Sequence, residues 1–75
     1  MNFYDWMMMR YAGKDTPRGD LARDMKLDKD FPKDGGRSEI LVHLKDKGAI
    51  DECLACFKRC WQDYQGEVQP CRSQQ

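Results

Sequence analysis

A fifteen-residue stretch, residues 50–64, constrains the fold of this chain more than any other part of its sequence. Apolar residues recur there at steps of three and four, at Ile50, Cys53, Leu54, Phe57, Cys60, Trp61 and Tyr64. At the angular step of an α-helix these positions fall within an arc of about 120°. The pattern therefore predicts an amphipathic helix. Because an apolar helix face is unstable in water on its own, we expect the remaining segments to fold over it.

Length and charge exclude some functions and disfavour others. The 75 residues suffice for one domain with a small core. A core of this size can hardly give up packing atoms to a deep substrate cavity. Lysine and arginine together number 13, aspartate and glutamate together also number 13, and the net formal charge is zero. The sequence therefore shows no basic stripe of the kind that displaces counterions from a nucleic-acid duplex.

The N-terminal segment predicts neither export nor membrane insertion. It contains Asp5 and has no basic lead-in before its apolar residues. No apolar run in the chain approaches the length needed to cross a bilayer. We therefore expect a cytoplasmic protein without a membrane contact, and we expect its four cysteines to be thiols, since the cytosol is reducing.

Capping residues predict two helices in the first half of the chain. Asn2 is a suitable N-cap for a helix that runs to about Tyr11, and Gly13 would end it. Thr16–Pro17 is a favourable helix start, because threonine caps a free amide and proline lacks one. The second helix is predicted to continue to about Asp28, with a narrower apolar face than the first.

A break between residues 29 and 37 separates these helices from a third. Phe31 stands directly before Pro32, which biases its backbone away from the helical region, so we expect its ring to plug the space between helices. Ser38 is the predicted cap of the third helix, over residues 39–47, and Gly48 would end it.

The predicted fold is all-α, a compact bundle of four to five short helices. The last helix is predicted to end near Gly66, so that residues 1–65 form the domain and residues 66–75 a frayed tail. The predicted core consists of Phe3, Trp6, Met7, Leu21, Met25, Phe31, Ile40, Leu44, Leu54, Phe57 and Trp61.

Three of these segments, taken in order, resemble the YozE-like family of small bacterial proteins with a SAM-like helical fold. They are residues 2–8 (Asn-Phe-Tyr-Asp-Trp-Met-Met), residues 28–33 with Phe31 and Pro32, and the aromatic positions Phe57, Trp61 and Tyr64. The resemblance covers residues 2–65. It implies a compact SAM-like bundle, and it brings no established activity, cofactor or catalytic residue.

The cysteines of the last helix are the one cluster that could carry chemistry. Cys53, Cys56 and Cys60 fall within about 60° of arc on one helix edge. We interpret Cys53 and Cys60 as small core residues and Cys56 as a boundary residue. Two alternatives are a zinc site that uses these thiols with Cys71 or His43, and redox sensing. We predict that the chain binds neither a cofactor nor a metal ion. Cys53, Cys56 and Cys60 are the candidate ligands for the alternative in which a metal ion is bound.

The leading functional hypothesis is a non-enzymatic module that binds an unidentified protein partner. The sequence has no catalytic group in an activating context and no cofactor fingerprint. The first helix is apolar over much of its circumference, which suggests an interaction surface at Tyr4, Met8, Met9 and Tyr11. We expect His43, the only histidine, on a helix flank and partly exposed.

The alternative hypothesis is nucleic-acid binding, in particular DNA binding. SAM-like bundles include nucleic-acid binders, and six basic residues could cluster after folding. These are Arg18, Arg23, Lys26, Lys29, Lys33 and Arg37. Enzyme activity ranks third, because the carboxylates are scattered over predicted solvated faces.

Overall fold

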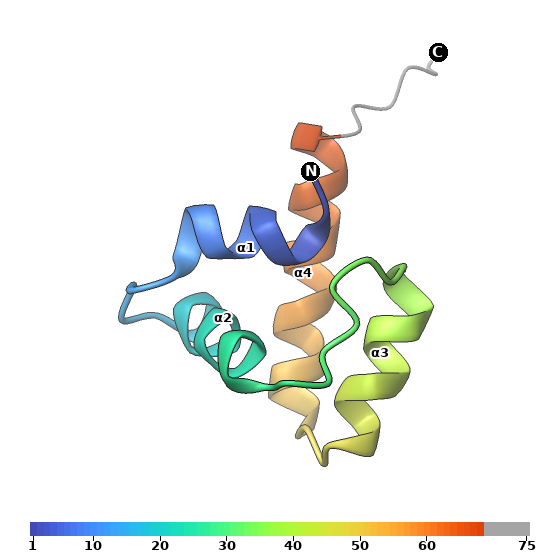
Figure 1. Cartoon of the computed structure of the whole chain (residues 1–75). Helices are drawn as coiled ribbons and strands as arrows, with labels where there is room; N and C mark the ends of the chain where they lie inside the picture. The colour runs from blue at the N-terminus through green and yellow to red at the C-terminus, as the bar shows by residue number, and fades with distance from the viewer. Residues whose placement is uncertain (69–75) are drawn as a thin grey trace.

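The computed structural model describes residues 1–68, and it contains four α-helices in that range (Figure 1). They are α1 (Phe3–Tyr11), α2 (Pro17–Leu27), α3 (Arg37–Asp46) and α4 (Asp51–Val68). No strand occurs among the described residues, so the predicted all-α bundle is confirmed. None of these four helices combines the length and apolar character that crossing a bilayer would require.

The longest helix, α4, is the common partner of the other three. Helices α1 and α2 pack against each other and against α4, whereas α3 packs only on α4 (Figure 1). The α2–α3 connection crosses α4 and carries Phe31, which is 5% exposed. The predicted role of Phe31 as a plug between helices is thereby confirmed.

The first two helix starts follow from their capping residues. Asn2 Oδ1 accepts a hydrogen bond from the Asp5 amide at 2.8 Å, and Thr16 Oγ1 accepts one from the Gly19 amide at 3.1 Å. Pro17 occupies the first position of α2, where a missing N–H costs nothing. Both predicted N-caps are confirmed.

The start of α3 differs from the prediction. The helix begins at Arg37, its N-cap is Gly36, and no side chain caps it, so the prediction that Ser38 caps this helix was wrong. The reason is the preceding turn, which the Gly35 amide closes by donating to the Pro32 carbonyl at 3.0 Å. Gly36 follows this turn with an extended backbone, and its carbonyl accepts a hydrogen bond from the Ile40 amide.

The end of α3 is a Schellman motif built on Gly48. The Gly48 amide donates to the Lys45 carbonyl and the Ala49 amide donates to the Leu44 carbonyl, both at 3.0 Å. Gly48 has φ +84°, the left-handed region that glycine enters without a steric penalty. The predicted stop at Gly48 is confirmed, and the motif turns the chain directly into α4.

Most of the predicted core is buried, with two exceptions. The side chains exposed by less than a tenth are Phe3, Trp6, Met7, Leu21, Ala22, Met25, Phe31, Ile40, Leu44, Phe57, Cys60 and Tyr64. Leu54 and Trp61 are only half-buried, because they lie at the edge of the α4 face that its neighbours cover. Ile50 is 64% exposed, although the periodicity placed it on the buried face. It lies in the α3–α4 turn, directly before the first residue of α4.

An aromatic cluster joins α1 to the middle of α4. The Phe3 ring centroid lies 5.4 Å from that of Phe57, 5.0 Å from Trp61 and 5.5 Å from Tyr64. Phe57 and Trp61 are themselves 6.0 Å apart. Offset and edge-on ring pairs at these distances add to the stability that burial alone provides.

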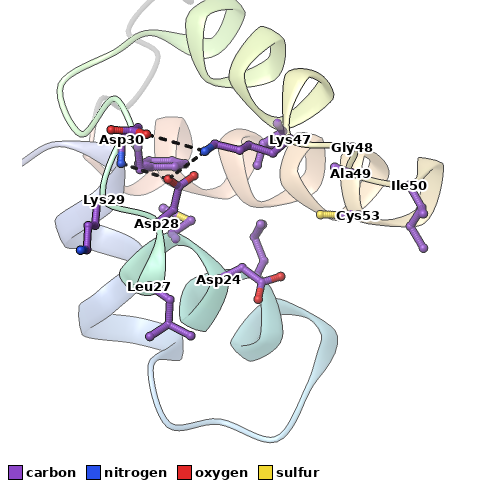
Figure 2. Close-up of a pocket in the computed structure, with 14 residues that line it drawn as sticks. Asp24, Leu27, Asp28, Lys29, Asp30, Lys47, Gly48, Ala49, Ile50 and Cys53 are labelled. Carbon is purple, nitrogen blue, oxygen red and sulfur yellow. Dashed lines mark hydrogen bonds and ion pairs between the residues drawn. The ribbon is translucent and has the colours of Figure 1, made fainter.

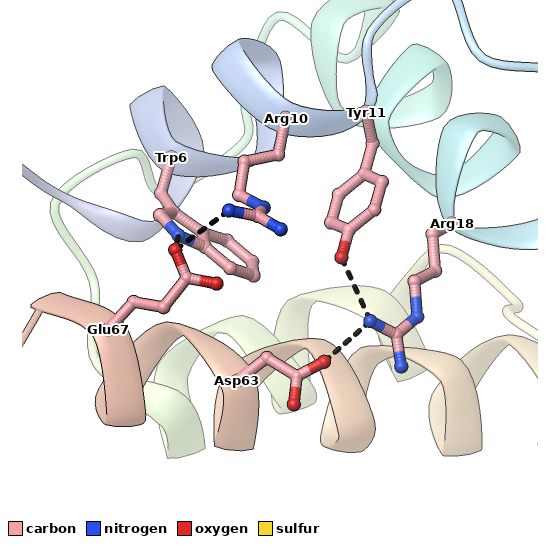
Figure 3. A network of polar contacts seen from close by, with 6 residues as sticks. All are labelled: Trp6, Arg10, Tyr11, Arg18, Asp63 and Glu67. Atoms are coloured by element: carbon pink, nitrogen blue, oxygen red, sulfur yellow. Dashed lines mark hydrogen bonds and ion pairs between the residues drawn. The ribbon is translucent and has the colours of Figure 1, made fainter.

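Polar contacts extend α4 beyond its predicted end. Glu67 Oε1 accepts hydrogen bonds from Arg10 at 2.9 Å and from the Trp6 indole at 3.3 Å (Figure 3). One turn earlier, Asp63 pairs with Arg18 at 2.5 Å. These contacts fasten the last turns to α1 and α2, so the helix continues to Val68, past the predicted end at Gly66. The rest of the predicted tail, residues 69–75, lies outside the described residues.

Candidate functional site

A groove lies where the end of α2, the α2–α3 connection, the α3–α4 turn and the start of α4 meet (Figure 2). Its volume is about 800 Å³. The buried apolar residues that line it are Leu21, Met25, Phe31 and Leu44, and Ala49 and Cys53 add half-buried surface. Gly48 completes the turn on one side. This concave surface is referred to as the groove.

Two exposed aliphatic side chains line the groove. Leu27, the last residue of α2, is 73% exposed, and Ile50, directly before α4, is 64% exposed. Large exposed aliphatic residues at one concave site are a recognised mark of binding surfaces. Leu27 was not among the residues predicted to form a binding surface, although its position in the sequence offered a signal. Leu27 lies on the opposite side of α2 from Leu21 and Met25, where the core does not require an apolar residue.

Charged side chains also line the groove, and most of them contact one another. Lys47 Nζ lies 3.8 Å from both an Asp28 oxygen and an Asp30 oxygen (Figure 2). Asp24 lines the groove as well, and no ion pair to it is found among residues 1–68. Lys29 extends away from Asp24 in Figure 2.

His43 and Asp28 form a pair at the edge of the groove. His43 Nε2 lies 2.6 Å from Asp28 Oδ2, and the His43 ring stacks edge-on against Phe31 at 5.7 Å. The hydrogen bond to His43, assisted by the Asp30 amide and by Lys47, lowers the pKa of Asp28 below its usual value. His43 is half-buried, as predicted, but it does not line the groove. The pair ties α3 to the end of α2.

The cysteines of α4 do not assemble into a metal site in the described part of the chain. No group of three histidine, cysteine or acidic side chains there is placed to hold a metal ion. Cys53, Cys56 and Cys60 are free thiols, and Cys71 lies outside the described residues. Cys60 is buried, as the core interpretation requires, and its burial raises the pKa of its thiol to about 12. Cys53 is only half-buried, and burial again raises the pKa of its thiol.

The four residues of α1 predicted as an interaction surface differ in exposure. Tyr4, Met8 and Tyr11 are half-buried and pack against the core. The Tyr11 hydroxyl accepts a hydrogen bond from Arg18 at 2.9 Å, which leaves it engaged within the fold (Figure 3). Met9 is 65% exposed. Met9 is therefore the most open of the four residues.

The basic residues proposed for nucleic-acid binding are partly engaged in contacts within the protein. Arg18 pairs with Asp63, and its hydrogen bonds to Tyr11 and that carboxylate raise its pKa above the usual value. Arg23 pairs with Asp20 one turn away. Lys33 Nζ lies 4.8 Å from the centre of the Tyr4 ring. Three of the six predicted basic residues thus have an acidic or aromatic partner, and no ion pair of Lys26, Lys29 or Arg37 is found among residues 1–68.

Comparison with known proteins places this geometry in a family. A family model described as YozE SAM-like fold matches residues 2–66. The matched range includes all of α1, α2 and α3 and most of α4, and hence every residue that lines the groove. Searches of curated proteins and of solved structures found no significant match. On the strength of the family match and the four-helix fold, this chain belongs to the YozE family of SAM-like fold proteins.

Proposed function

We propose that this chain is a non-enzymatic interaction module that binds another protein through the groove. The observation that carries the proposal is the exposure of two large aliphatic side chains, Leu27 and Ile50, in one groove. Covering these side chains would remove apolar surface from water, and each fully buried aliphatic side chain contributes about 1.5–3 kcal/mol. A partner that fills the groove would supply this cover.

The chemistry around the groove supports binding in preference to catalysis. The His43 ring nitrogen that faces the groove edge is already engaged by Asp28. Cys53 is the thiol that lines the groove, and its raised pKa keeps it in the poorly nucleophilic protonated form. A catalytic site would be expected to contain an activated base or nucleophile facing its cavity.

Site-specific photo-cross-linking in cells that naturally make the chain tests the proposal. Benzoylphenylalanine at position 50 places the reactive group at the groove. The matched control is position 42, since Val42 is 57% exposed on α3 but does not line the groove. We expect a protein adduct from position 50 that is absent from position 42. Adding Leu27→Ser should reduce the yield of that adduct.

Other outcomes of this experiment would redirect the assignment. The same adducts from positions 50 and 42, or none from position 50, would contradict the proposal. Benzoylphenylalanine at position 9 provides a third arm, because Met9 is the exposed member of the surface predicted on α1. An adduct from position 9 alone would move the binding surface to α1. An adduct that nuclease removes would favour nucleic-acid binding.

A further inference from the structure

The charge pattern of the groove limits what kind of protein segment can occupy it. Of the three carboxylates that line the groove, Asp28 and Asp30 lie near Lys47, and Asp28 also contacts His43. Asp24 is the third, without an ion pair among residues 1–68. A cation on a bound segment could pair with Asp24 without breaking an existing contact.

The helix geometry adds to this preference. Helix α2 ends at Leu27 and α3 ends at Asp46, so two helices terminate beside the groove. The C-terminal end of a helix carries partial negative charge, and this favours a cation nearby. The basic residue in the last turn of α2 is Lys26, which does not line the groove. Lys47, which pairs with the C-cap residue Asp28, offsets part of this field, and Lys29, which also lines the groove, extends away from Asp24 (Figure 2). The part of the field near Asp24 therefore favours a cation on a ligand.

The backbone N–H and C=O groups of the bound segment must also find hydrogen-bond partners. An extended peptide binds well where a sheet edge offers main-chain partners, and the described residues contain no strand. A helical segment satisfies its own backbone groups and needs only a complementary apolar surface. The groove supplies such a surface mainly through the exposed side chains of Leu27 and Ile50. The buried side chains Leu21, Met25 and Leu44 add smaller apolar areas to its lining.

From these observations we propose that the groove binds an amphipathic helix of a partner protein whose apolar face is bordered by lysine or arginine, with Asp24 as the residue that recognises the cation. This inference rests on the proposed function, since it specifies the partner of the same groove. Leu27 and Ile50 contact the apolar face of that helix, and Asp24 distinguishes a basic helix from an acidic one.

A pair of synthetic peptides of about 14 residues, with blocked termini, tests this proposal. Both carry leucines at steps of three and four. The remaining positions alternate alanine with lysine in one peptide and alanine with glutamate in the other. Each is titrated into the isotopically labelled full chain, and amide chemical shifts are followed by NMR. We expect the lysine peptide to shift groove amides and the glutamate peptide to bind more weakly.

Matched variants then assign the charge preference to Asp24. Asp24→Asn should weaken binding of the lysine peptide about two- to fivefold, the range expected for a partly exposed ion pair. Asp15→Asn, at an exposed position away from the groove, should leave the affinity for the lysine peptide unchanged. Ile50→Ser should weaken the binding of both peptides, whereas Val42→Ser should weaken the binding of neither. Circular dichroism of each variant verifies that the fold is retained.

Several outcomes would overturn the proposal. Equal or tighter binding of the glutamate peptide in the groove would reject the basic helix and leave protein binding at the groove intact. An Asp24→Asn variant that binds the lysine peptide as the parent does would also reject it. If neither peptide shifts groove amides, the inference fails, and the cross-linking experiment still decides the proposed function. A dimer of the free protein that Ile50→Ser dissociates would assign the groove to a second copy.

Discussion

Substituting Gly19 by alanine tests the packing of α2 against the segment that precedes it. Gly19 is buried in the first turn of α2, and the Lys14 backbone passes directly over it. A Cβ atom at this position would lie 2.0 Å from the Lys14 carbonyl oxygen and 2.7 Å from its carbon. Both contacts are to backbone, so a side-chain rotation cannot relieve them.

The size of the effect follows from two opposing contributions. The Lys14 segment must retreat by about 1.4 Å before its oxygen reaches the 3.4 Å at which ordinary contact begins. Overpacking of this kind costs about 1–3 kcal/mol. Alanine is favoured over glycine inside a helix by about 1 kcal/mol at most, and this offsets part of the cost. We expect Gly19→Ala to lower the free energy of unfolding by about 1–2 kcal/mol, and Tm by about 5–15 °C.

A second helical glycine supplies the control. Gly66 lies in α4, and a Cβ atom there would meet nothing within 4 Å. Gly66→Ala should therefore stabilise the protein by about 0.5–1 kcal/mol through helix propensity alone. Thermal and urea unfolding followed by far-ultraviolet circular dichroism measure both variants. A Gly19→Ala protein as stable as the parent, or a Gly66→Ala protein destabilised to the same degree, would refute the reasoning.

Three further predictions concern pH, thiol reactivity and the core. Because the pKa of Asp28 is lowered in the folded state, its contribution to stability is present above the unfolded pKa of 3.8 and is lost as pH falls through the folded value. Urea titrations should show that Asp28→Ala destabilises at pH 7 and that the difference from the parent shrinks below about pH 4; a constant difference would contradict this. Iodoacetamide at pH 8 should leave Cys60 unmodified in the folded protein and label it in urea, because burial raises the pKa of its thiol to about 12. Fragment-ion mass spectrometry separates it from Cys71 on the same tryptic peptide, and labelling of Cys60 at the unfolded rate would count against the buried site. Phe57→Ala should lower the free energy of unfolding by about 3–5 kcal/mol, which is enough to abolish cooperative unfolding in a small domain. Trp61→Ala removes a ring that is only half-buried, so this variant should still show a measurable unfolding transition.

Local signals were sufficient to predict the helices. Asn2 and Thr16 cap α1 and α2 through their own side chains, and Gly48 enters a backbone region that few other residues tolerate. Each of these effects depends on residues within one helical turn. The fold class and most of the core follow, since apolar spacing within a helix decides which side is buried.

Two features were not predictable from capping preferences and apolar periodicity alone. The N-cap of α3 is Gly36 and not the predicted Ser38, because the turn closed by Pro32 and Gly35 determines where the helix begins. Ile50 fits the apolar period of α4, but its side chain is 64% exposed in the folded chain. Helix periodicity states which side of a helix is apolar, and it does not state how far along the helix the partners extend.

The groove illustrates the same limit for the candidate site. Its lining comes from α2, the α2–α3 connection, the α3–α4 turn and α4, which meet only in three dimensions. The solitary apolar Leu27 on a polar helix side was the one signal in the sequence. The interaction surface predicted on α1 rested on composition, and the fold half-buries Tyr4, Met8 and Tyr11 against the core.

The contact between the first residue and the late part of α4 has a consequence for how this domain can be tethered. The Tyr64 hydroxyl donates to the Met1 carbonyl at 3.0 Å, which brings the N-terminus beside the far end of α4 (Figure 1). The α3–α4 turn, which forms part of the groove, lies at the opposite end of α4 (Figure 1). A surface, a fluorophore or a fused protein attached at the N-terminus would therefore leave the opposite pole facing outward and accessible.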